Sequence, residues 1–94
     1  MQSYLVEAYL PPFQADEARS AGRRARAAAE ELSREGRAVR YVRTTFLPDD
    51  EMCFHVFEAA SADVVEEVSR RAALGHARIV PAIEASRARR RPAR

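Results

Sequence analysis

The sequence predicts a single α+β domain whose elements follow one another as strand, helix, strand, strand, helix and strand. Two patterns predict this order. Four stretches alternate between apolar and polar residues, as strands do, and two stretches carry apolar residues at helical spacing. The length of 94 residues suits one domain.

The first half of the chain contains the first three elements. Residues 3–10 alternate, and Pro11 ends the strand because proline has no N–H to donate. Alanines recur at helical spacing over residues 15–35, and Gly36 stands where a glycine caps a helix end. Residues 38–47 predict the second strand.

The second half repeats the order of strand, helix and strand. The acidic turn at Pro48 leads into residues 52–59, the third strand, so this pair forms a hairpin. Residues 61–74 predict the second helix, with Ser61 as its N-cap. Residues 77–84 predict the last strand, where Pro81 indicates a sheet edge or a bulge.

This order is that of the ferredoxin-like βαββαβ fold. Right-handed crossovers place the strands of a four-stranded antiparallel sheet in the order 4-1-3-2, with both helices on one face. The other face is then bare. We expect two copies to pack over it as a homodimer that resembles a dimeric α/β barrel.

Charge divides the chain into two parts. All 16 basic residues are arginine, and residues 1–84 carry a formal charge of −3 whereas residues 85–94 carry +5. The prediction is therefore a domain over 1–84 and a disordered, arginine-rich tail over 85–94. No stretch is long and apolar enough to span a membrane, and the start lacks a signal peptide pattern, so we expect a cytoplasmic protein.

The alternation also predicts which residues face away from the helices. Val6 and Ala8 on the first strand, and Phe54 and Val56 on the third, suit the helix-covered side. The open face then carries Leu5, Glu7, Tyr9, Cys53, His55 and Phe57. Tyr41, Arg43 and Thr45 join it unless a bulge inverts the second strand.

Glu7 and His55 are then neighbours on adjacent strands. A carboxylate beside an imidazole can share a metal ion, or it can neutralise charge at a dimer interface. Cys53 adds a soft ligand, although a lone cysteine more often packs in a core. Tyr9, Tyr41 and Arg43 complete the polar lining of a possible ligand site. His76 suits a surface or capping role.

Several function classes are disfavoured. No glycine-rich phosphate loop, catalytic triad spacing or paired-histidine zinc motif occurs in the sequence. RNA-recognition domains share this strand order, but the acidic residues 49–51 replace the basic start of their motif, so we expect no specific nucleic-acid binding.

Four segments carry a resemblance to a known family: residues 4–7, the alanine-rich first helix, residues 57–59, and residues 70–74 with 78–80. Together they resemble a family of small bacterial domains of unknown function that includes a nickel-binding protein. The resemblance covers residues 3–84. It implies a ferredoxin-like homodimer with at most a metal or small-ligand site.

The chain departs from the family pattern in three places. His55 stands where the family has a cysteine, Val68 stands where it often has a histidine, and residues 73–75 read Ala-Leu-Gly in place of Gly-Leu-Pro. Among the matching positions, Glu7 and His55 keep ligand character. Nickel, zinc or copper suits such a pair better than magnesium or calcium.

The first hypothesis is a homodimeric protein that binds a transition metal, such as nickel, or a small ligand at the open sheet face. The alternative is a dimeric α/β-barrel enzyme, of monooxygenase or isomerase type, in which Glu7 or His55 moves a proton of an aromatic or polyketide-like substrate. A third reading is an interaction module whose arginine tail docks on an acidic partner. The sequence leaves these open.

Overall fold

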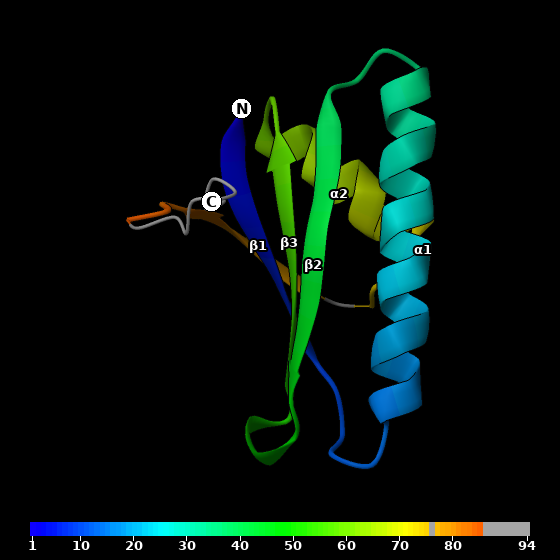
Figure 1. Cartoon of the computed structure of the whole chain (residues 1–94), viewed down its shortest axis with the longest axis vertical. Helices are drawn as coiled ribbons and strands as arrows, with labels where there is room; N and C mark the ends of the chain where they lie inside the picture. The colour runs from blue at the N-terminus through cyan, green and yellow to red at the C-terminus, as the bar shows by residue number, and fades with distance from the viewer. Residues whose placement is uncertain (76, 86–94) are drawn as a thin grey trace, which may run out of the picture.

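The computed structural model describes residues 1–75 and 77–85, and these form one sheet with two helices on the same face (Figure 1). The element order is the predicted βαββαβ. The bounds are β1 Gln2–Tyr9, α1 Ala15–Arg34, β2 Val39–Leu47, a short 3₁₀ turn Pro48–Asp50, β3 Met52–Ala59, α2 Ala62–Arg71 and β4 Ala77–Ala82. The predicted tail lies outside the described residues, apart from Ala85.

All strand pairs are antiparallel, and the sheet order is β2-β3-β1-β4. Read from the other edge, this order is β4-β1-β3-β2. Pro81 lies in β4 at the edge of the sheet, as its missing N–H requires. The hairpin between β2 and β3 turns through Pro48–Asp50, and Glu51 adopts a left-handed conformation there.

The core lies between the helices and the sheet. The buried stripe of α1 is alanine and glycine apart from Leu32, so this helix approaches the sheet closely. Three valines of α2, Val64, Val65 and Val68, are fully or nearly buried. Phe57 is the largest fully buried side chain. Ser61 occupies the N-cap of α2, but its side chain makes no capping hydrogen bond.

An ion-pair cluster joins the two helices at their carboxyl ends. Arg71 of α2 lies within 2.6–2.8 Å of carboxylate oxygens of Glu31 and Glu35 in α1 and of Glu67 in its own helix. The hydrogen bonds from Arg70 and Arg71 lower the pKa of Glu67 to about 2. Among the described residues, no helix is long and apolar enough to cross a membrane.

Register decides which face each strand residue occupies, because directly paired residues share a face. In β1, Tyr4, Val6 and Ala8 are buried beneath the helices, as expected for Val6 and Ala8. Their partners in β3 are Phe57, His55 and Cys53. The predicted assignment of β3 is therefore wrong by one residue.

The physical reason is that β3 alternates between two sets of nearly equal hydropathy. Phe54 and Val56 looked like the buried set, but they pair with Glu7 and Leu5 on the open face. In β2 the register shifts between Tyr41 and Arg43. This bulge leaves Tyr41 on the covered face and Arg43 on the open face.

Candidate functional site

The structure separates the residues that were expected to form one site. Glu7 lies on the open face, paired with Phe54 and Arg78. His55 lies on the covered face, where it is 1% exposed. The expected Glu7–His55 pair therefore does not form, because the sheet stands between the two side chains.

The other expected ligand-site residues divide in the same way. Tyr9 and Arg43 lie on the open face, and Tyr9 is exposed. Cys53 and Tyr41 lie beneath the helices, with Cys53 2% exposed. The open face thus keeps a carboxylate and an arginine, whereas the imidazole and the thiol lie on the covered face.

A chain of hydrogen bonds runs through the covered face from β2 to β3. Tyr41 Oη lies 2.6 Å from Thr44 Oγ1, which lies 2.8 Å from His55 Nδ1. On the far side of the ring, Nε2 lies 3.7 Å from Cys53 Sγ. Every buried side-chain nitrogen and oxygen in the described ranges has a hydrogen-bond partner. These hydrogen bonds satisfy the polar atoms of the buried imidazole.

The imidazole and the thiol of this hydrogen-bond chain are both uncharged at neutral pH. Burial, together with the nearby Arg24 guanidinium, lowers the pKa of His55 to about 4. Burial, together with the charge of Glu17, raises the pKa of the Cys53 thiol. The site therefore presents a neutral imidazole beside a protonated thiol.

Cys53 and His55 line a hollow of about 390 Å³ at the end of the sheet. Its wall combines the end of β1, the start of α1 and the segment after α2. Arg24 fixes part of this wall, since its guanidinium donates to the Ala72 carbonyl at 2.8 Å and to Glu17 at 3.0 Å. The pair is thus reached from a defined hollow rather than from the open face.

The donor set is a partial fit to a transition-metal ion. Thiolate and imidazole are ligands for zinc, nickel and copper, and sulfur and nitrogen on a tetrahedral zinc stand about 3.6 Å apart. The observed 3.7 Å is close to that separation. Within residues 1–75 and 77–85, however, no three His, Cys, Asp or Glu side chains come together as a metal-holding group. The described residues thus supply two ligand atoms.

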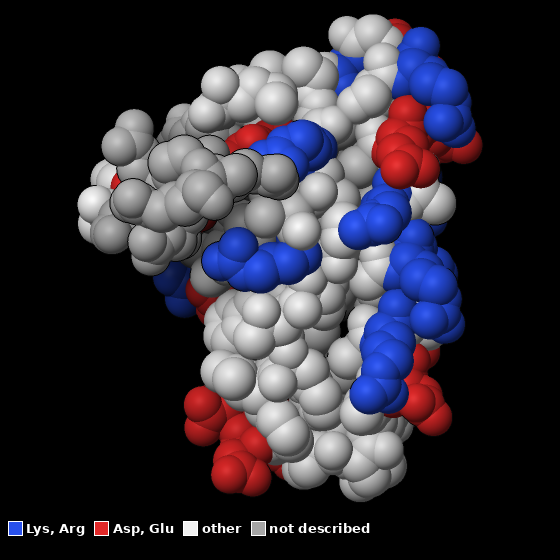
Figure 2. Space-filling model, viewed as in Figure 1, with Lys and Arg blue, Asp and Glu red and all other residues white. Residues whose placement is uncertain are grey.

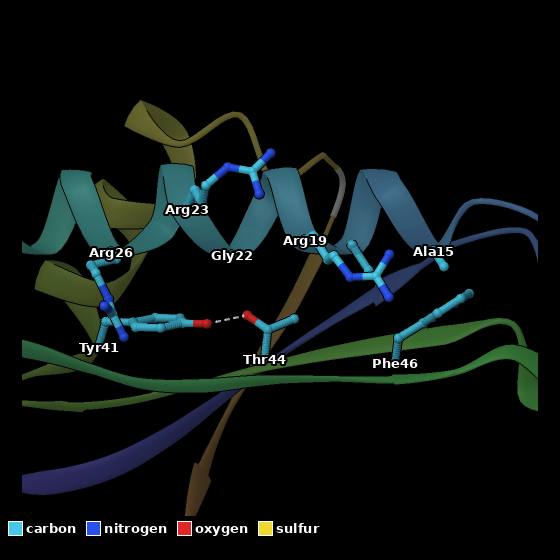
Figure 3. A pocket seen from close by; sticks show the side chains of 9 residues that line it. Ala15, Arg19, Gly22, Arg23, Arg26, Tyr41, Thr44 and Phe46 are labelled. Atoms are coloured by element: carbon cyan, nitrogen blue, oxygen red, sulfur yellow. Dashed lines mark hydrogen bonds between the residues drawn. The ribbon is translucent and has the colours of Figure 1, made fainter.

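The Tyr41 end of the hydrogen-bond chain lies in a groove between α1 and β2 (Figure 3). Tyr41 and Thr44 line it from the strand, and three arginines line it from the helix. Our sequence reasoning missed Thr44, because the bulge in β2 has no signal in the sequence. The arginines do have a signal in the sequence, because their spacing of four and three residues places them on one side of α1.

A family model described as "Nickel responsive protein SCO4226-like" matches residues 4–81 of the chain. The comparisons with curated proteins and with solved structures gave no match.

Proposed function

The chain belongs to the family of SCO4226-like nickel responsive proteins, and from this premise we propose that it binds a nickel ion, or a similar transition-metal ion, through Cys53 Sγ and His55 Nε2. The observation that carries the proposal is the 3.7 Å approach of these two atoms in a buried hollow. Glu7 has no part in it, because it lies on the opposite face of the sheet.

The surroundings of His55 favour a ligand role. A metal on Nε2 requires the ring hydrogen to be on Nδ1, and Thr44 Oγ1 stands 2.8 Å away to accept it. Such a partner on the second nitrogen fixes the orientation and tautomer of a ligating histidine. Because the pKa of His55 is about 4, no proton has to leave the ring at neutral pH.

Cys53 makes the affinity for metal depend on pH. Its thiol must lose a proton to bind metal, and burial raises its pKa. Metal affinity should therefore increase as the pH rises above neutral. The described residues supply two ligand atoms, and further donors such as water complete the coordination.

The test is nickel titration of the metal-free protein by calorimetry, with near-ultraviolet absorption to detect a thiolate–nickel band. Cys53→Ser and His55→Gln should each weaken binding by at least about tenfold. Glu7→Gln is the matched control and should bind like the wild type. Unchanged affinity in both site variants, or an equal loss in Glu7→Gln, would refute the assignment. Circular dichroism confirms that each variant is folded.

We also propose that a second copy covers the open face. Val56, Leu5 and Val80 form an apolar row across it, with Arg43 next to Val56 at one end, and Phe54 and Glu7 lie in the adjacent row. A homodimer in the cytoplasm, where the single thiol stays reduced, is consistent with this face and with one free cysteine. The barrel-enzyme alternative is weaker. It requires Glu7 or His55 to transfer a proton at the open face, and only Glu7 lies there.

A further inference from the structure

We propose that the groove between α1 and β2 is a second binding site, which takes a small organic anion with a phosphate or carboxylate group on an apolar body. The groove has a volume of about 610 Å³, within the range of small-molecule sites. It shares no lining residue with the hollow at Cys53 and His55, and anion binding there does not require a bound metal.

The charge of the groove is the first argument. Arg19, Arg23 and Arg26 line it, and no acidic residue does. Arg19 pairs with Asp16 at an exposed position, whereas Arg23 and Arg26 have no ion pair within the described parts of the chain. Arginine side chains gather along α1 on this side of the molecule (Figure 2). Such a surface attracts anions.

The orientation of the arginines is the second argument. Arg19 and Arg26 extend from α1 toward β2, at the two ends of the groove, whereas Arg23 extends away from β2 (Figure 3). The Arg26 guanidinium lies over the Tyr41 ring, 5.4 Å from the ring centroid. Stacking on an aromatic face limits the freedom of this side chain, so less entropy is lost when it binds a ligand.

The floor is the third argument. Ala15, Ala18 and Phe46 offer apolar contact, and the hydroxyls of Tyr41 and Thr44 offer hydrogen bonds. Gly22 leaves room for the two hydroxyls, because a Cβ there would lie 3.0 Å from Thr44 Oγ1 and 3.1 Å from Tyr41 Oη, closer than most Cβ contacts. The groove therefore combines cationic ends, polar atoms and an apolar base, which suits an amphiphilic anion better than a bare ion.

The test is a titration of isotope-labelled, chelator-treated protein with phenyl phosphate, benzoate and the uncharged benzyl alcohol, followed by NMR. Phenyl phosphate or benzoate should bind with a Kd of about 1 mM or below and shift the amides of α1 and β2 around Gly22 and Thr44. Tighter binding of phenyl phosphate assigns the site to phosphate esters, and tighter binding of benzoate assigns it to carboxylates.

Two double variants distinguish binding in the groove from a general effect of the protein's net charge. Arg19→Gln with Arg26→Gln should weaken anion binding at least about tenfold. Arg34→Gln with Arg37→Gln removes the same charge from exposed positions outside the groove and should change anion binding less than about twofold. Any of three results would overturn the proposal. The two double variants could lose the same affinity, benzyl alcohol could bind as tightly as the anions, or neither anion could bind at about 10 mM.

Discussion

The two faces of the sheet differ in where they place polar chemistry. The open face carries its charged groups at the surface, where Arg40 pairs with Glu58 at 2.7 Å and the arginine remains more than half exposed. The covered face holds an imidazole, a thiol and two hydroxyls beneath the helices, joined in one hydrogen-bond chain. Polar groups inside a core must form hydrogen bonds with one another. This requirement fixes their positions more strictly than at the surface, where water can serve as the partner.

The alanine-rich α1 helps to explain how the covered face accommodates these groups. Small side chains let the helix lie close to β2, and at Gly22 the helix has no side chain over the two hydroxyls. The contrast between the faces can be tested by changing matched residues on each.

The largest difference should appear between two phenylalanines of β3. Phe57 is fully buried and meets Tyr41 edge to face at 5.8 Å between ring centroids, whereas Phe54 is half-buried on the open face. Phe57→Ala should lower the free energy of unfolding by about 3–5 kcal/mol and Phe54→Ala by about 1 kcal/mol in dilute protein, as measured by urea unfolding.

The same pair tests the proposed homodimer. If a second copy covers the open face, the effect of Phe54→Ala grows with protein concentration and that of Phe57→Ala does not. Similar effects of the two substitutions in dilute protein would contradict the assignment of faces.

Acidification should destabilise the covered face through His55, the one histidine among the described residues. Its pKa is about 4 in the folded protein and about 6.5 when unfolded, so the unfolded chain binds the proton more tightly. Stability from this group is complete above pH 6.5 and is lost as the pH falls toward 4.

The loss should amount to at most about 3 kcal/mol. Urea unfolding of metal-free wild type and His55→Gln between pH 7 and 4.5 measures it as the difference in pH slope. Parallel slopes for the two proteins would show that the ring is not held neutral by its surroundings.

A smaller effect distinguishes two adjacent threonines. Thr44→Val removes the middle of the hydrogen-bond chain and leaves Tyr41 Oη and His55 Nδ1 without their partner, at a cost of about 1–3 kcal/mol. Thr45→Val, one residue later on the open face, is exposed and should change stability by less than about 0.5 kcal/mol. Thermal melts of both variants give the comparison, and equal melting temperatures would count against a structural role for the chain.

The sequence was sufficient to predict the order of elements and the face of β1. The alternation in β1 sets a tyrosine, a valine and an alanine against a leucine, a glutamate and a second tyrosine, so the buried set is evident. The same reasoning failed in β3, where the two alternating sets are nearly equal in hydropathy and the set that contains His55 is the one buried. Burial of His55 becomes favourable only because Thr44 lies beside it, and that contact depends on the bulge after Tyr41.

The candidate sites were therefore predicted by residue type but not by location. Cys53 and His55 remain the proposed ligands, whereas Glu7 lies on the other side of the sheet. A single sequence contains the alternation of side chains but not the register that relates one strand to another.

The hydrogen-bond chain also has a direction. Each hydroxyl has one hydrogen to give, so the hydrogens of Tyr41, Thr44 and His55 can run in one of two senses. When Nδ1 donates to Thr44 and Thr44 donates to Tyr41, the phenol hydrogen is left for the groove. A metal on Nε2 and an anion beside Tyr41 require this same sense. Each ligand would thus favour the other, and by thermodynamic linkage the two couplings are equal.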